Sequence, residues 1–233
     1  MVACFLWGAG VLLTAWEDRL SREAKGATSS ARTPAEMLFA RAGAIQPLLA
    51  DWFWLRANRA WEARDEQDAR LWLRLTVATE PSSSYFRANA ARMIAFDFPR
   101  WAEARDRSMP LAVRRARNAR YATEALAWLF ERGAGELAAR DWIEAGNISL
   151  YGQEDLALAA GFYRTAAELP DAPWYAGRIC AALLERAGRP CEALVWLRQW
   201  APGLPADDPA AGREIVMAWI ARLEDQCGST EAF

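Results

Sequence analysis

Residues 174–205 have the sequence WYAGRICAALLERAGRPCEALVWLRQWAPGLP, and this pattern predicts two short helices folded against each other. Gly188 supplies the left-handed residue that ends the first helix, and Pro190 begins the second at little cost. Neither helix can bury an apolar face alone, so the hairpin has to stack on neighbouring helices. Apolar residues at three- and four-residue steps mark the two faces, Trp174, Tyr175, Ile179, Leu183 and Leu184 in the first helix and Ala193, Leu194, Leu197 and Trp200 in the second.

A related pattern occurs 34 residues earlier in residues 140–173, and a third copy fits residues 50–81. Ala69, Ala159 and Ala193 occupy the same position in the three copies, and Pro81 and Pro205 close two of them. This arrangement resembles the tetratricopeptide repeat (TPR), which has a period of 34 and a closing proline. The resemblance implies a right-handed solenoid of antiparallel helical hairpins, and the absence of alternating β-branched runs independently predicts an all-α chain. Asp208 and Pro209 begin a last helix at residues 208–225, whose terminal position suits a capping helix.

The start of the first copy is also similar to a group of bacterial repeat proteins that are anchored in a membrane by an N-terminal apolar segment. The residues that carry this similarity are Asp51, Trp52, Trp54, Leu55, Arg56 and Ala57, with Trp72, Leu75, Thr76 and Pro81. The resemblance implies an anchored scaffold without an assigned biochemical role.

Residues 2–16 contain no charged side chain, but they are shorter than the roughly 20 residues that span a bilayer. Three interpretations stay open: a membrane anchor, the core of a signal peptide, or a buried first helix. We expect an anchor, followed by a polar linker at residues 17–32, a TPR-like domain at residues 33–227 and a tail at residues 228–233. The domain begins with a capping box at Thr33 and Glu36. The sequence favours an extracytoplasmic position over a cytoplasmic one only weakly.

The region between the first and second copies is longer than one repeat and shorter than two. It predicts a helix that ends at Phe98-Pro99 and a second helical stretch interrupted at Pro110. We expect an insertion or a lengthened helix near Pro110.

Composition argues against several function classes. The chain has no histidine, which removes the usual general base and the commonest metal ligand. The net charge of −2 lacks the positive charge that nucleic-acid binding needs. The cysteines form no C-x-x-C motif, and Cys180 and Cys191 are interpreted as small core residues. The sequence predicts no enzyme, cofactor, metal or small-molecule substrate.

Acidic clusters at Asp65, Glu66 and Asp68, and at Glu154 and Asp155, fall at predicted starts of second helices. Carboxylates are favoured there by the helix dipole, so this explanation is preferred to a calcium or catalytic site.

Two sets of residues are candidates for binding a partner. Trp52, Arg56 and Arg59 share one side of the first repeat helix, and tryptophan and arginine are enriched in binding hot spots. Arg114, Arg117 and Tyr121 share another helical face that suits a carboxylate or phosphate of a partner.

The sequence therefore predicts a non-catalytic scaffold or adaptor that binds a protein or peptide and is tethered to a bacterial membrane through residues 2–16. The alternative is a structural subunit of a larger membrane-associated assembly. A helical enzyme that uses the acidic clusters is a third and weaker interpretation.

Overall fold

The computed structural model describes residues 45–131 and 137–228, and this part of the chain consists of helices and turns without a β-strand. The all-α prediction is thereby confirmed. The chain divides into two compact units, one ending at Phe86 and the other beginning at Arg87, and each is treated by itself. The predicted anchor, the linker, the capping box at Thr33 and nearly all of the predicted tail lie outside the described residues.

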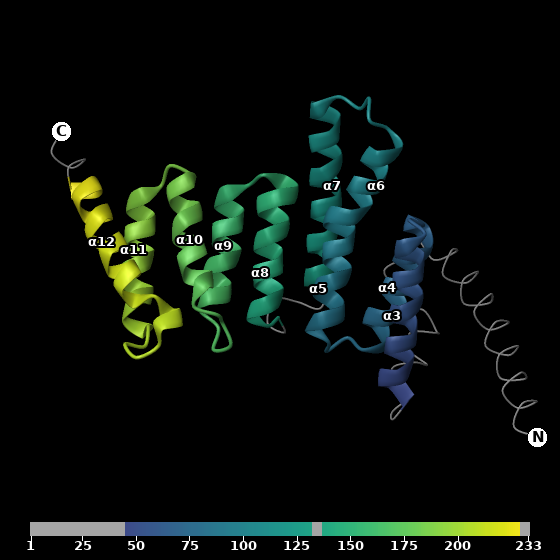
Figure 1. Ribbon diagram of the computed structural model, residues 1–233, viewed down its shortest axis with the longest axis horizontal. Helices are drawn as coiled ribbons and strands as arrows, with labels where there is room; N and C mark the ends of the chain where they lie inside the picture. Colours follow the sequence, from purple (N-terminus) through teal and green to yellow (C-terminus); the bar gives the residue numbers. More distant parts are fainter. Residues whose placement is uncertain (1–44, 132–136, 229–233) are drawn as a thin grey trace, which may run out of the picture. The chain divides into compact units, whose positions relative to one another are not determined.

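The first unit is built on a pair of helices, α3 (Gln46–Glu62) and α4 (Glu66–Thr79), joined by a short turn (Figure 1). Pro47 lies in the first turn of α3, where its missing N–H breaks no hydrogen bond. Asp65 caps α4, because its carboxylate accepts a hydrogen bond from the Asp68 N–H at 3.0 Å. The core of this unit includes Phe53 and Ala57 from α3 and Leu73 from α4.

The boundary between the units falls within α5 (Ser84–Arg92). A π-helical turn, η2 (Met93–Asp97), then leads directly into α6 (Phe98–Arg105), so the predicted helix end at Phe98-Pro99 is wrong. Pro99 is the second residue of α6, which begins directly after this π turn. The predicted interruption at Pro110 is confirmed, and α7 (Leu111–Phe130) follows it as a helix of 20 residues.

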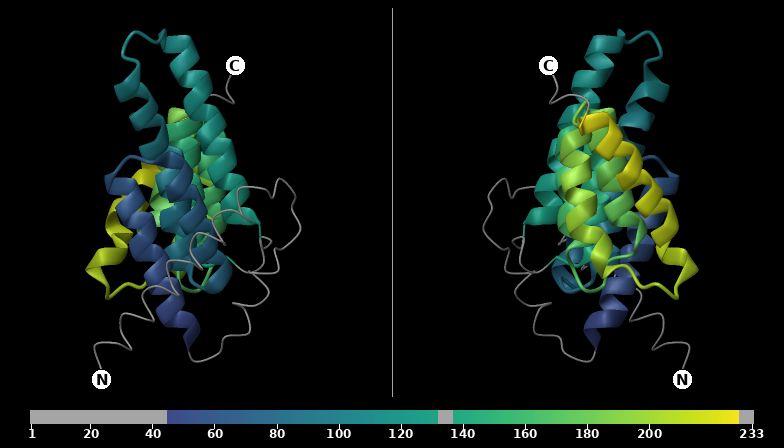
Figure 2. Two further views of the ribbon diagram at one scale, coloured as in Figure 1. Left: turned by 90° about the vertical axis from the view of Figure 1, so that its right-hand side faces the viewer. Right: turned by 90° about the vertical axis from the view of Figure 1, so that its left-hand side faces the viewer.

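The rest of the second unit is a row of helices in which each packs on the next (Figures 1 and 2). In chain order the elements are α8 (Ala139–Ile148), the π-helical turn η4 (Ser149–Gln153), α9 (Leu156–Ala167), α10 (Tyr175–Arg186), α11 (Pro190–Trp200), the 3₁₀ turns η5 (Ala201–Gly203) and η6 (Pro209–Ala211), and α12 (Arg213–Gly228). Gly188 has the predicted left-handed conformation, with φ of 76°, between α10 and α11.

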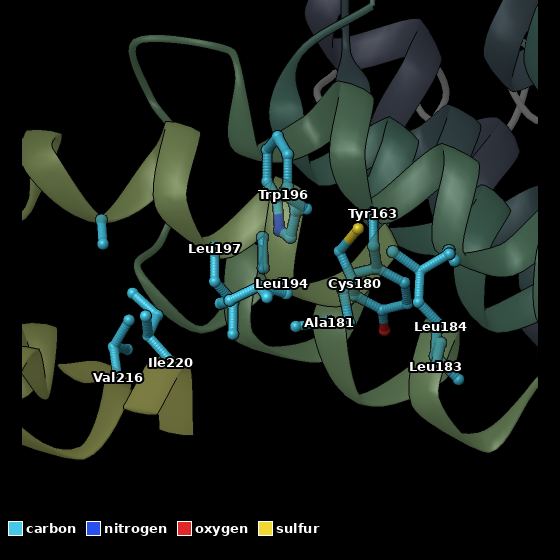
Figure 3. Close-up of a cluster of buried hydrophobic side chains, with 14 of the residues drawn as sticks. Tyr163, Cys180, Ala181, Leu183, Leu184, Leu194, Trp196, Leu197, Val216 and Ile220 are labelled. Carbon is cyan, nitrogen blue, oxygen red and sulfur yellow. The ribbon is translucent and has the colours of Figure 1, made fainter. Parts of the chain in front are cut away.

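The core of this row runs continuously from α9 to α12 (Figure 3). Leu183, Leu197 and Val216 are buried in it and come from α10, α11 and α12 respectively. The Trp196 indole N–H donates to the Gly177 carbonyl at 2.9 Å, which joins α11 to α10 through a buried polar contact. Tyr175 was expected on the buried face of the first helix, and this prediction is wrong because its side chain is 44% exposed.

Small residues bring the helices close enough for large rings to pack between them. A Cβ atom on Gly177 would lie 2.2 Å from the Trp200 ring, and one on Gly146 would lie 2.6 Å from the Tyr163 ring. Both distances are shorter than any van der Waals contact. The glycines therefore mark the places where a ring from the second helix of a hairpin lies against the backbone of the first.

The replacement Gly177→Ala is expected to lower the free energy of unfolding by about 1–3 kcal/mol, because the added methyl overlaps the Trp200 ring. Gly161→Ala is the matched control, since its Cβ would meet no atom within 4 Å and alanine is the better helix former by about 1 kcal/mol. Urea unfolding followed by circular dichroism measures both. Equal stabilisation by the two alanines would contradict the close contact.

One cysteine prediction is confirmed and another is wrong. Cys180 is 1% exposed within the core, and burial raises the pKa of its thiol to about 12. Cys191 is exposed at the start of α11 and forms a disulfide with Cys227 of α12, across a Cα–Cα distance of 5.7 Å. The local hairpin pattern could not indicate this pairing, because the two residues are 36 positions apart and approach only when α12 packs on α11.

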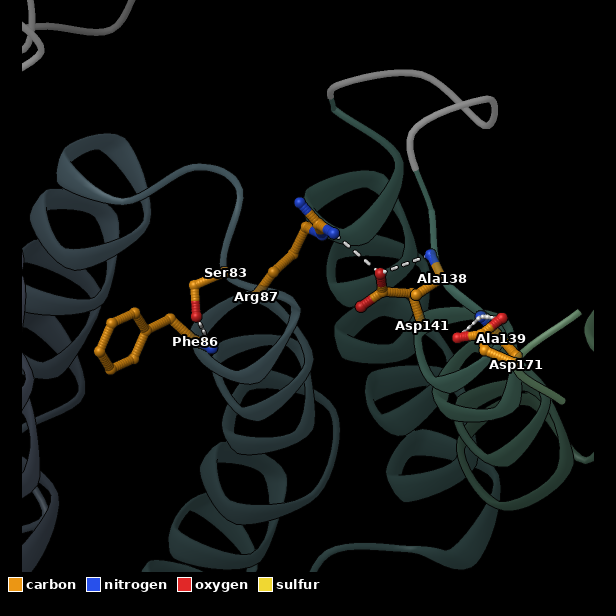
Figure 4. A network of polar contacts seen from close by, with 7 residues as sticks. All are labelled: Ser83, Phe86, Arg87, Ala138, Ala139, Asp141 and Asp171. Carbon is orange, nitrogen blue, oxygen red and sulfur yellow. Dashed lines mark hydrogen bonds and ion pairs between the residues drawn. The ribbon is translucent and has the colours of Figure 1, made fainter. Parts of the chain in front are cut away.

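A buried ion pair joins α5 to α8 within the second unit (Figure 4). The Arg87 guanidinium donates to the Asp141 carboxylate at 2.8 Å, and the two side chains are 4% and 0% exposed. Asp141 also accepts a hydrogen bond from the Ala138 N–H at 3.2 Å, and Asp171 accepts one from the Ala139 N–H. The start of α8 is therefore held by carboxylates from its own first turn and from the turn after α9.

Candidate functional site

The first predicted site lies on α3, where Trp52, Arg56 and Arg59 share one side of the helix, as their spacing predicts. The Arg56 guanidinium lies 5.9 Å from the centre of the Trp52 ring and 5.1 Å from that of Trp72, which is buried in α4. The two indoles meet edge to face at 5.7 Å. Arg56 is thus held over an aromatic cluster by cation–π attraction, whereas Arg59 is exposed.

The same side of α3 presents large apolar side chains to solvent. Leu48 and Leu55 are 69% and 65% exposed, and the half-buried Trp52 lies between them. Their spacing of four and three residues is the spacing with which one helix presents a seam to another helix. We name Leu48, Trp52, Leu55, Arg56 and Arg59 the α3 surface. It combines an apolar strip with two cations, which is the composition of a protein-binding face.

The second predicted site lies on α7. Arg114 forms an ion pair with Glu103 of α6, and the Arg117 guanidinium contacts the Met109 sulfur at 3.2 Å. Tyr121 is 8% exposed, and its ring packs edge to face on Phe98. The structure therefore places Arg114 and Arg117 half-buried beside α6, while it buries the tyrosine against the start of that helix.

Next to these arginines lies a hollow of about 390 Å³ within the second unit, which we name the α6–α7 hollow. Its walls come from η2, α6, α7 and η4. The lining residues are Ala95, Phe96, Pro99, Arg100, Glu103, Asn118, Tyr151 and Gly152. Apolar groups therefore share the hollow with a cation, a carboxylate, an amide and a phenol.

Two π-helical turns give the hollow its shape. Both η2 and η4 pack on α7, and π turns occur frequently at functional sites because they redirect side chains. A Cβ on Gly152 would lie 2.6 Å from the Ala122 Cβ, so a glycine is needed for η4 to approach α7 this closely. Glu154 ends η4 in the left-handed conformation, with φ of 59°.

Sequence reasoning missed Arg100, Asn118 and Tyr151 as members of one site. The three residues come from different helices, and a π turn has no recognisable sequence pattern. The only indication in the sequence was that Asn118 lies four residues after Arg114 and so on the same helical face as that candidate site residue.

The acidic clusters have structural roles. Asp65 caps α4, and Asp155 caps α9 by accepting from the Leu158 N–H at 2.9 Å. Glu66 pairs with Arg70, and Glu154 forms an ion pair with Arg115 of α7 at 3.3 Å. These carboxylates lie at starts of second helices, as predicted, and are engaged in caps and ion pairs.

Comparison of the chain with protein-family models, with curated proteins and with solved structures finds no match. The TPR resemblance therefore stays a prediction.

In residues 45–131 and 137–228, no helix combines the length and the apolar character that crossing a membrane requires. Residues 2–16, where an anchor was predicted, lie outside these ranges.

Proposed function

We propose that this chain is a non-catalytic scaffold that binds a protein partner through the α3 surface and is tethered to a bacterial membrane through residues 2–16. The observation that carries the proposal is the exposure of Leu48 and Leu55 beside an arginine held over two indoles. A helix face that contacts only water normally carries polar side chains, whereas tryptophan and arginine are enriched at the centres of protein interfaces.

The partner element that fits this surface is an amphipathic helix with acidic residues at its edge. Leu48, Trp52 and Leu55 repeat at the heptad spacing that a helical seam uses. Arg56 and Arg59 flank the strip with positive charge, which selects carboxylates on the partner.

We also propose that the hairpins of the second unit belong to a right-handed TPR-like solenoid. Contacts between residues 34 positions apart support this. The Trp174 indole donates to Asp208 at 3.0 Å, and the Trp219 indole donates to Glu185. In each contact the two residues are separated by 34 positions, which is the predicted repeat period, so each contact joins corresponding positions of neighbouring repeats.

The Cys191–Cys227 disulfide supports an extracytoplasmic position for the body of the protein. Disulfides persist in oxidising compartments and are rare in a reducing cytosol.

The test is a pull-down of the full-length chain from native membranes in mild detergent. Wild-type chain is expected in the membrane fraction with a defined partner, and Trp52→Ala/Arg56→Ala is expected to lose that partner. Trp61→Ala/Arg74→Ala is the matched control, since Trp61 lies nine residues from Trp52 and so on the opposite side of α3. The purified partner should then bind wild-type chain directly, with a dissociation constant at least about tenfold lower than for the Trp52 variant.

A second variant keeps the test independent of folding. Leu55→Glu changes a side chain that is 65% exposed, so it should leave the thermal melting curve unchanged while it abolishes binding. Recovery of the chain alone, or in the soluble fraction, would contradict the tethered scaffold. A partner that resists high salt and detergent and without which the chain aggregates would favour the permanent-subunit alternative.

A further inference from the structure

We propose that the α6–α7 hollow binds a short acidic peptide segment of a protein partner. The inference rests on the proposed scaffold function and gives it a second contact, with a ligand of stated chemistry. It concerns residues of the second unit only.

The size and lining of the hollow suit a peptide. Its volume of about 390 Å³ lies in the range of binding pockets, about 300–1,000 Å³, and it has room for side chains but not for a folded element. Phe96 and Pro99 offer apolar contact to a partner side chain. The amide of Asn118 offers a donor and an acceptor, which match a peptide backbone.

The charge around the hollow selects an anion. Arginines outnumber carboxylates along α6, α7 and the loop between them. The arginines are Arg100, Arg105, Arg107, Arg114, Arg115, Arg117 and Arg120, and the carboxylates of residues 97–130 are Asp97, Glu103, Asp106 and Glu124. Arg114 and Arg115 are paired with Glu103 and Glu154, and the remaining arginines still exceed the remaining carboxylates. Arg100 is exposed and lines the hollow directly, so its guanidinium is placed to bind a carboxylate through two parallel hydrogen bonds.

A peptide fits better than a lipid headgroup or a free phosphate. Glu103 lines the hollow, and its charge is balanced by the ion pair with Arg114, so it does not oppose a carboxylate bound at Arg100 and can accept a hydrogen bond from a peptide N–H. The apolar wall formed by Phe96 and Pro99 would contact an apolar peptide side chain but nothing on a small inorganic anion.

The test uses the full-length chain in detergent and an array of octapeptides that varies charge and apolar content independently. Peptides with two or more carboxylates and one large apolar residue are expected to bind, and their Asn/Gln counterparts are expected to bind at least about tenfold more weakly. Arg100→Gln and Tyr151→Ala should each weaken binding by about tenfold. Both side chains are exposed, Tyr151 by 69%, so the fold should be unaffected.

Arg198→Gln and Tyr175→Ala are the matched controls, because they remove an exposed arginine and an exposed tyrosine from α11 and α10. Absence of peptide binding, equal binding of neutral peptides, or unchanged binding by Arg100→Gln would overturn the proposal. Competition by inorganic phosphate, or by phosphatidylglycerol vesicles against phosphatidylcholine vesicles, would overturn it in favour of an anion or a membrane surface.

The same variants separate this proposal from the scaffold function. If binding of a partner recovered from membranes depends on Trp52 but not on Arg100, the proposal that the hollow binds a peptide is contradicted and the scaffold function is supported. Recovery of no partner by wild-type chain would sink the scaffold.

Discussion

The variant Asp141→Asn is expected to unfold with a free energy about 3–5 kcal/mol lower than that of the wild type. Asp141 is fully buried, and its partner Arg87 is 4% exposed, so neutralising the carboxylate leaves a buried guanidinium without its counter-charge. Asparagine has nearly the same shape and can still accept from the Ala138 N–H, so the effect reports the lost charge. Urea unfolding of the purified chain measures it.

Two further variants test whether the loss of the Asp141 charge causes the destabilisation. The double variant Arg87→Met/Asp141→Asn should be more stable than Asp141→Asn alone, because removing both charges removes the uncompensated one. Glu224→Gln breaks an exposed ion pair, in which the Arg198 side chain is 57% exposed and that of Glu224 is 43% exposed. It should lower the free energy of unfolding by less than about 1 kcal/mol. If Asp141→Asn behaved like Glu224→Gln, the pair would not be buried in solution.

Removal of the disulfide by Cys191→Ser/Cys227→Ser is expected to lower the free energy of unfolding by about 2–4 kcal/mol. The bond joins residues 36 positions apart, so it restricts the unfolded chain while it holds α12 on α11. A reducing agent should destabilise the wild type by a similar amount and leave the variant unchanged.

Thiol labelling provides the control for that experiment. Cys180 should resist alkylation in the folded protein, because it is 1% exposed and burial raises the pKa of its thiol to about 12, which keeps it protonated at neutral pH. Cys191 should be labelled only after reduction. Labelling of Cys191 without reduction, together with no effect of the reducing agent, would show that the bond does not form.

The helical class and the main turns followed from local chemistry. Gly188 ends one helix and Pro190 begins the next because backbone conformation at these positions depends on the residue itself. Asp65 and Asp155 cap helices for the same reason, since a capping carboxylate bonds to an N–H three residues away. The spacing of Trp52, Arg56 and Arg59 likewise predicted their common side of α3.

Features that depend on contacts between distant residues did not follow from local patterns. Pro99 suggested a helix end, but the π turn before it carries the chain on into α6. Tyr175 matched the apolar periodicity of its helix, yet no neighbouring helix covers it fully, because periodicity gives the face of a residue and not the extent of the partner.

By itself, the sequence determined an all-helical protein with hairpins ended by Gly188 and Pro190, and placed Trp52 and Arg56 on one helix face. Only the tertiary structure decided that Cys191 pairs with Cys227, that Arg87 is buried on Asp141, and that Arg100, Asn118 and Tyr151 surround one hollow. The reason is physical: capping and periodicity act over three or four residues, whereas these groupings depend on how close helices approach, and that distance is set where Gly152 meets Ala122 and Gly177 meets Trp200.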